Sequence, residues 1–292
     1  MTNWCATVLG ELEFAGIGDE AAPDLAGQLA ATRALGWHAV ELRSIGGLAL
    51  ADLPDQQFHA VAEVLRAEQI TVPCVDSRIG NWARPITTPF HQDLAELDIL
   101  TRRCAELGTR YVRIMSYPND GLASGVWRRR VVDRIRRLTE RAEQAELVLL
   151  HENCSGWAGT SAERTLDLIE AADSPALRVL FDTGNGVAHG YSGIDLLRDL
   201  APYVEHVHVK DAVPVAGGAL YTVPGAGRAR VADCLRLLAD TGYSGFLSIE
   251  PHLAIQPHEG HAVAGEGTAD RFVWAGRCLE MLVRDERRAE AI

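Results

Sequence analysis

The sequence predicts an α/β protein built as one (β/α)₈ barrel, a single domain over residues 1–292. Short runs of aliphatic and β-branched residues alternate with longer segments that have helical apolar spacing, which is typical of alternating strands and helices. The length suits this architecture, because such barrels commonly take roughly 250 residues as one unit. An open nucleotide-binding sheet is disfavoured, since the sequence has neither a GxGxxG motif after the first strand nor a GxxxxGK[ST] motif.

Eight strands are expected in chain order, each a short β-rich run: 12–18, 39–43, 71–76, 111–117, 147–153, 178–182, 205–211 and 245–250. Helices are expected between them, with apolar spacing of 3.6 residues, at 24–35, 91–107, 128–146, 231–241 and 271–288. Gly36, Gly108 and Gly242 follow three of these helices, where a left-handed residue ends a helix. The long segments 212–230 and 251–270 are expected to be loops at the barrel mouth.

The composition restricts the classes of function. The chain has 40 acidic and 28 basic residues and a formal charge of −12, so it lacks the positive field that nucleic acids require. No run approaches the ~20 apolar residues of a membrane span, and the first residues resemble no signal peptide. The six cysteines form no CxxC pair. We therefore expect a cytoplasmic protein with a small-molecule substrate and no nucleic-acid or membrane partner, and a homo-oligomer stays open.

Polar residues close four consecutive predicted strands. Their positions are Glu152, Asp182, His208 and Glu250. Chemistry in a barrel lies where the strands end, and burying such groups without partners is costly. Three carboxylates and an imidazole, with no sulfur, suit Mn²⁺, Mg²⁺ or Co²⁺ in octahedral geometry. The pattern therefore predicts one divalent cation at the barrel mouth; the alternative is that these strand ends meet solvent and pair with arginines.

Four short motifs contain these residues. They read HEN at His151–Asn153, FDTGN at Phe181–Asn185, HVHVKD at His206–Asp211 and SIEPH at Ser248–His252. In these motifs and their order the chain resembles the xylose-isomerase-like TIM-barrel superfamily, a group of sugar phosphate isomerases and epimerases. Inosose dehydratase, ketose 3-epimerases and endonuclease IV are relatives in that group. The resemblance covers essentially the whole chain.

The resemblance implies both a ligand set and an acid/base pair. The implied metal ligands are Glu152, Asp182, His208 and Glu250. Mn²⁺ is the expected ion, and Mg²⁺, Co²⁺ or Zn²⁺ are alternatives. Glu152 and Glu250 would also move the proton. The fold and the metal site are specific implications of these motifs, whereas the substrate is not.

The sequence departs from two of these relatives. Asn185 and Pro214 stand where ketose 3-epimerases carry a histidine and an arginine. Endonuclease IV needs further histidines for a three-metal cluster, but the second and third predicted strands end in Arg43 and in residues 76–78, without a histidine. A DNA-repair function is therefore disfavoured.

Lys210 is the only lysine among the 28 basic residues. It lies two residues after His208, so on a strand both side chains point to the same side. We expect its ammonium to act catalytically at the barrel mouth, where it would meet an enediolate, carboxylate or phosphate. An ion pair with a loop carboxylate is the alternative.

Further side chains are candidates for substrate binding: His252, Asn185, Arg228, Arg113 and Trp157. Arg43, Trp127 and Tyr117 are additional pocket candidates. The segment Pro224–Arg228 resembles a phosphate-cradling loop, although such loops are common. The arginine-rich run 128–137 is expected to be a solvated helix face that nearby glutamates compensate.

Three functions are compatible with these residues. The first is a metal-dependent isomerase or epimerase of a sugar, keto-sugar or cyclitol, which acts through a metal-stabilised enediolate with Glu152 and Glu250 as the acid/base pair. The second is a lyase or dehydratase that performs β-elimination on an inosose or a 3-keto-glycoside, including C- or O-deglycosylation. The third is a non-catalytic barrel subunit of a larger complex, which would have no need of the four polar strand ends.

Overall fold

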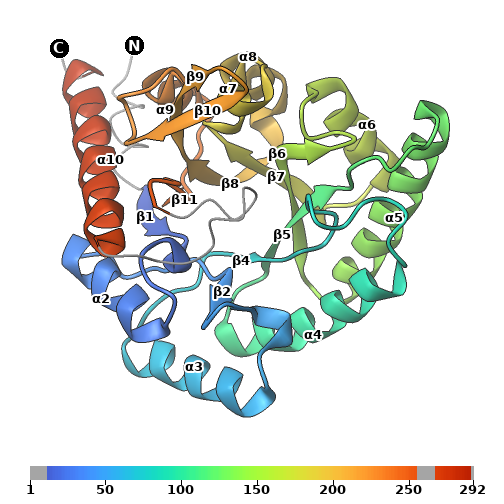
Figure 1. Ribbon diagram of the computed structural model, residues 1–292, viewed down its shortest axis with the longest axis horizontal. Helices are drawn as coiled ribbons and strands as arrows, with labels where there is room; N and C mark the ends of the chain where they lie inside the picture. Colours follow the sequence, from blue (N-terminus) through green and yellow to red (C-terminus); the bar gives the residue numbers. More distant parts are fainter. Residues whose placement is uncertain (1–11, 255–266, 291–292) are drawn as a thin grey trace. The chain divides into compact units, whose positions relative to one another are not determined.

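The computed structural model describes residues 12–254 and 267–290 (Figure 1). By its internal contacts the chain forms two compact units. Unit 1 comprises Met1–Val40 and Phe181–Ile292, and unit 2 comprises Glu41–Leu180. Strand β7 (Leu177–Asp182) belongs to both, because the chain passes from unit 2 into unit 1 within it. Within the described ranges, no helix is both long and apolar enough to cross a membrane.

Unit 1 contains the strand order β1-β11-β8-β7. Strands β1 (Glu13–Gly16), β11 (Phe246–Ile249) and β8 (Val204–Val209) pair in parallel, with Ala15 opposite Ser248 and Ser248 opposite His208. An antiparallel hairpin, β9 (Asp211–Val215) and β10 (Gly218–Thr222), follows β8. The helical segments of this unit are η1 (Gly18–Glu20), α2 (Leu25–Leu35), α7 (Asn185–His189), α8 (Gly193–Leu200), η3 (Ala201–Tyr203), α9 (Val231–Asp240) and α10 (Thr268–Glu290).

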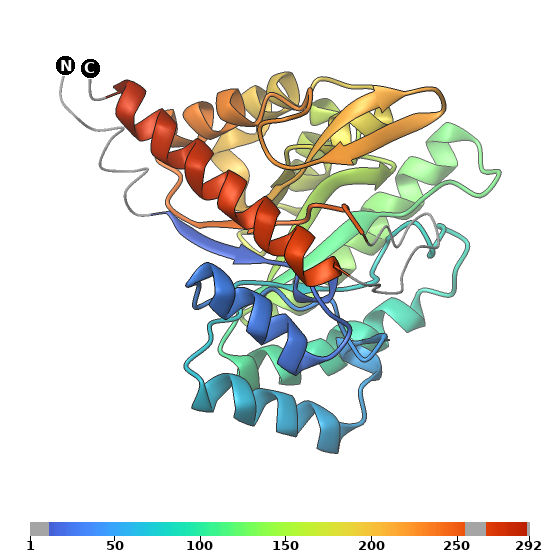
Figure 2. The same ribbon diagram turned by 60° about the vertical axis from the view of Figure 1, so that its left-hand side comes forward.

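Helix α10 packs along α2, so segments from both ends of the sequence lie side by side (Figure 2). The Trp37 indole, just after α2, donates a hydrogen bond to Glu280 Oε1 on α10 at 2.8 Å. Phe14 of β1 stacks on Trp37 with ring centroids 5.6 Å apart. Unit 1 is therefore closed by contacts between residues more than 240 positions apart in sequence.

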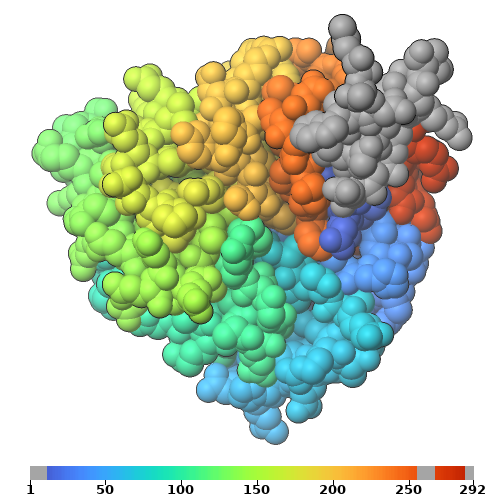
Figure 3. Space-filling model, turned by 180° about the vertical axis from the view of Figure 1, so that it is seen from behind, coloured from blue at the N-terminus to red at the C-terminus, as the bar shows by residue number. Residues whose placement is uncertain are grey.

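Unit 2 contains the strand order β7-β6-β5-β4, also parallel. The strands are β4 (Val75–Asp76), β5 (Tyr111–Ser116) and β6 (Val148–Gly156), and a small hairpin joins β2 (Ser44–Ile45) to β3 (Leu48–Ala49). The helical segments are η2 (Leu50–Asp52), α3 (Asp55–Ala67), α4 (His91–Leu107), α5 (Ser124–Gln144) and α6 (Ala162–Ala172). Helices α5 and α6 pack together and form part of the surface in Figure 3.

The helix predictions are confirmed to within a few residues, and 91–107 is confirmed at both ends. The strand expected at 39–43 is reduced to isolated bridge residues at Ala39, Glu41 and Leu42, and Leu42 pairs in parallel with Val75. The chain leaves the sheet here because Gly46 and Gly47, both with positive φ, turn Ser44–Ile45 into the β2–β3 hairpin. The segment 212–230 contains the β9–β10 hairpin rather than only loop, and most of 251–270 lies outside the described residues.

Candidate active site

Three of the predicted strand-end residues lie together in unit 1. Asp182 ends β7, while His208 lies on β8 and Glu250 directly follows β11. All three are buried, and one carboxylate oxygen or imidazole nitrogen from each lies within 4.8 Å of the others. The parallel register places Ser248, two residues before Glu250, opposite His208. The cluster therefore follows directly from the pairing of these strands.

The Lys210 side chain is buried among these groups. Its Nζ lies 2.7 Å from Glu250 Oε2 and 3.2 Å from Asp182 Oδ2, and it donates a hydrogen bond to Asn185 Oδ1 at 3.2 Å. The Lys210 backbone is held on both sides by Thr183, whose hydroxyl donates to the Lys210 carbonyl at 2.6 Å and accepts from its N–H at 2.9 Å. Lys210 therefore brings a fixed positive charge between two carboxylates.

Glu250 is kept ionised by its neighbours. Burial by itself raises the pKa of this carboxyl, but the Lys210 ammonium, His252 and His208 together hold its pKa well below the usual range. An ionised carboxylate has the oxygens to bind a cation and to accept a proton, and the lowered pKa favours the first of these roles.

A glutamate that the sequence analysis missed positions His252. Both oxygens of Glu20 contact this residue: Oε2 accepts from the His252 backbone N–H at 2.7 Å, and Oε1 lies 2.6 Å from Nδ1. The imidazole packs edge-on against Tyr221 with ring centroids 4.9 Å apart, and its Nε2 lies 3.7 Å from Glu250 Oε1. His252 has φ of 51°, a strained backbone that Glu20 stabilises. The signal available in the sequence was a glutamate just after the first strand.

Glu152 lies in unit 2, buried on β6 in register with Leu180 of β7. Asp182 is two residues further along that same strand. Arg113 on β5 is buried beside Glu152, with its Nη1 3.4 Å from Glu152 Oε2, and its Nε donates to Asp76 Oδ1 at 3.1 Å. Arg113 therefore contacts two buried carboxylates.

The other candidate residues have diverse surroundings. Trp157 is buried in unit 2 with the guanidinium carbons of Arg128 and Arg164 5.9 and 5.7 Å from its ring centroid. Arg228 is exposed on the loop after β10. The Tyr117 side chain is fully buried, and its hydroxyl donates to Asp93 at 2.9 Å. Burial lowers the pKa of His151 to about 4, so this imidazole is neutral near pH 7.

The loop that follows β10 is organised by Asp211. Its carboxylate accepts hydrogen bonds at 2.9–3.0 Å from the backbone N–H groups of Ala212, Gly225, Gly227 and Ala229. A Cβ at Gly227 would lie 2.1 Å from Asp211 Oδ1, so only glycine fits there. The interpretation of this loop as a phosphate cradle is therefore wrong, because amides that would bind phosphate already bind a carboxylate.

We expect Asp211→Asn to destabilise the protein by about 2 kcal/mol, because the new NH₂ group faces backbone donors and leaves at least one of them unsatisfied. Urea denaturation followed by circular dichroism measures the change. Asp199→Asn is the matched control, since Asp199 is exposed on α8 and its replacement should cost less than about 0.5 kcal/mol. Equal stability of both variants would contradict the role of Asp211.

Comparison with known proteins places this geometry in context. An inosose dehydratase from Clostridium botulinum is 27% identical over an alignment of 132 positions, which covers 40% of this chain and 44% of that protein. The aligned part thus spans less than half of the curated relatives' length. A zinc-bound IolI protein superposes with a TM-score of 0.73 at 15% identity, covering 94% of this chain and 99% of that one. A D-psicose 3-epimerase with D-tagatose, from Clostridium cellulolyticum, superposes with a TM-score of 0.71 at 18% identity over 92% and 98% of the two chains.

The solved structures have low sequence identity and establish the fold alone, which is the predicted α/β TIM barrel. The family model for the xylose isomerase-like TIM barrel matches residues 29–268, most of the chain. That range contains the three clustered strand-end residues, Lys210 and Glu152. The resemblance in the sequence motifs is thereby confirmed, and the chain belongs to the xylose isomerase-like TIM barrel family.

Proposed function

We propose that this protein is a divalent-metal-dependent isomerase or epimerase of a sugar, keto-sugar or cyclitol. The observation that carries the proposal is the buried cluster of Asp182, His208 and Glu250 around the Lys210 ammonium. Buried charges at this density are costly, and a protein retains them where a reaction uses them. Family members named as epimerases and dehydratases support an enzymatic function.

Glu152, Asp182, His208 and Glu250 are the proposed ligands of one divalent cation, with Mn²⁺ as the expected ion. The donor set fits such an ion, because it consists of carboxylate oxygens and an imidazole nitrogen, and three of the groups already converge within 4.8 Å. When bound, the cation would act as a Lewis acid toward the substrate's carbonyl and neighbouring hydroxyl oxygens.

The chain's own residues perform the proton transfer in this proposal. Glu250 is ionised and would accept the proton from the carbon next to the carbonyl, and Glu152 would return one. The fixed Lys210 ammonium would stabilise the negative charge that develops on the substrate oxygen. His252, Asn185, Arg113, Arg228 and Trp157 remain the proposed substrate-binding side chains. Of these, Asn185 has the firmest support, since it accepts a hydrogen bond from Lys210.

A lyase that eliminates water or an aglycone is the second candidate. It is favoured by the similarity to curated relatives named inosose dehydratase. The same base would remove the proton, and a group on the adjacent carbon would then leave instead of a proton being returned. The two reactions therefore share their first step and differ in the second.

Proton NMR in deuterated water separates these candidates. The chelated and Mn²⁺-reconstituted proteins are each incubated with ketohexoses, inososes and 3-keto-glucosides. For the isomerase or epimerase, we expect solvent deuterium at one substrate carbon while the substrate keeps all its substituents. This exchange should occur only in the Mn²⁺-reconstituted protein. Loss of water or of an aglycone would assign the lyase instead. The non-catalytic subunit would be favoured if two results occur together. None of the substrates is converted, and elemental analysis finds that the protein retains no metal after the Mn²⁺ reconstitution.

A further inference from the structure

Unit 2 has a hollow beside the first half of α5. Its volume is about 490 Å³. It is lined by one aromatic residue, one valine, one aspartate and four arginines: Phe90, Val126, Asp133, Arg129, Arg130, Arg134 and Arg137. The lining carries three more positive than negative charges, in a chain whose formal charge is −12. Such a hollow is the opposite of what the overall composition predicts.

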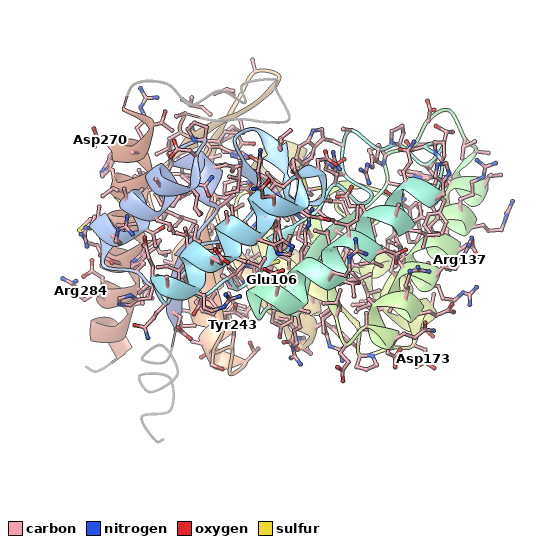
Figure 4. All side chains as sticks on the ribbon, turned by 90° about the horizontal axis from the view of Figure 1, so that it is seen from below. Glu106, Arg137, Asp173, Tyr243, Asp270 and Arg284 are labelled. Carbon is pink, nitrogen blue, oxygen red and sulfur yellow. The ribbon has the colours of Figure 1, made fainter. Side chains whose placement is uncertain are left out.

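The arginines of the hollow differ from the others on the same helix. Outside it, Arg128, Arg136 and Arg141 pair with Asp167, Glu140 and Asp98 at 2.5–2.6 Å. Inside it, Arg129 and Arg130 are exposed and make no hydrogen bond or ion pair with any described residue, and Arg137 reaches Asp133 only at 3.8 Å. The predicted solvated helix face is therefore correct, but its compensation by nearby carboxylates holds only outside the hollow. Arg137 is labelled on α5 in Figure 4.

Arg134, which lines the hollow, is fixed by several contacts. Arg134 is largely buried, donates to the Thr88 carbonyl at 2.7 Å, and places its guanidinium carbon 5.2 and 5.1 Å from the ring centroids of Phe90 and Tyr117. Its nearest carboxylate, Asp93, is 3.9 Å away and is already bound by Arg84 at 2.8 Å. The charge of Arg134 is thus only partly compensated, and it adds to the positive potential of the hollow.

Three of the cations of the hollow lie on one face of α5. Arg130, Arg134 and Arg137 stand at i, i+4 and i+7 on one face of α5, a span of about 10 Å along the helix axis. Guanidinium groups bind phosphate oxygens through two parallel hydrogen bonds, which an ammonium or a neutral donor cannot reproduce. We propose that this hollow binds the diphosphate group of a small molecule. The proposal stands independently of the reaction at the strand ends.

Titration calorimetry of the full-length protein with inorganic pyrophosphate tests this site. The protein is first freed of metal with a chelator and dialysed, so that pyrophosphate cannot bind through a cation at the strand ends. At low ionic strength we expect saturable binding that is tighter than that of inorganic phosphate. The double variant Arg129→Gln/Arg130→Gln should weaken pyrophosphate binding at least tenfold, since each removes charge-assisted hydrogen bonds from an exposed position.

Arg136→Gln is the control. It removes one positive charge from the same helix, where the double variant removes two, but Arg136 is paired with Glu140 and does not line the hollow. We expect its pyrophosphate affinity to stay within about twofold of wild type. The proposal is overturned if pyrophosphate shows no saturable binding, if it binds no tighter than phosphate, or if Arg136→Gln weakens binding as much as the double variant does.

Discussion

Glu250→Gln and Glu152→Gln are each expected to reduce turnover by about 10³-fold or more while the protein still retains a divalent cation. The amide keeps an oxygen donor for the metal but cannot accept a proton, so proton transfer fails before binding does. For Glu250 the effect is reinforced because Lys210 loses its 2.7 Å carboxylate partner. Turnover by solvent deuterium incorporation and metal content by elemental analysis measure the two consequences separately.

Glu106→Gln provides the control for these variants. Glu106 contacts an exposed histidine, His59, at 2.9 Å near the end of α4, so the same substitution there also disrupts a carboxylate–imidazole pair (Figure 4). This variant should keep wild-type turnover and metal content. If Glu250→Gln or Glu152→Gln turns over at near the wild-type rate, the proton is moved by another group and the proposed acid/base pair is wrong.

Lys210→Arg is expected to lower kcat/KM by about 10²-fold, although the charge is conserved. The ammonium is buried 2.7 and 3.2 Å from two carboxylates, a space in which a planar guanidinium cannot keep the same donor geometry. Loss of a preorganised cation where negative charge develops typically costs about 3 kcal/mol. A fall in kcat would place the ammonium at the developing charge, whereas a rise in KM alone would indicate that it only anchors the substrate.

The reverse exchange on the surface is the control for Lys210. Arg198→Lys alters an exposed cation that pairs with Asp195 on α8, and surface ion pairs contribute little. Both activity and stability should stay at wild-type values. An unchanged kcat/KM in Lys210→Arg as well would remove Lys210 from the proposed site.

The strand ends of the second half of the chain were predictable because they depend on local patterns. Side chains alternate between the two faces of a strand, so Lys210, which directly follows β8, was expected on the same side as His208. Both side chains contact Glu250. Glu20 was not predictable in this way, since its partner His252 lies 232 positions away. The role of Asp211 could not be predicted for a related reason. Its carboxylate accepts hydrogen bonds from four backbone N–H groups, and almost any residue type can supply such a donor. Only Gly227 is restricted to one residue type by this contact.

The second predicted strand shows that residue composition does not fix the length of a strand. Residues 39–43 have the composition of a strand, but they form only isolated bridges, such as the one between Leu42 and Val75. The two glycines after this segment favour a local hairpin, and this local preference competes with sheet extension at the same place. Within the described residues, the pattern therefore gives the order of the strands more reliably than their length.

The pairing of β1 with β11 has a consequence for synthesis on the ribosome. Residues 13–16 form their parallel ladder with residues 246–249, so β1 cannot pair until its partner has been made some 230 residues later. At roughly 5–20 residues per second this delay is on the order of 10–50 s. Unit 2 is contiguous in sequence and can complete its own ladder during that time. A circular permutant that begins at residue 41 would deliver the segments of unit 1 consecutively, and the early strand would no longer emerge long before its partner.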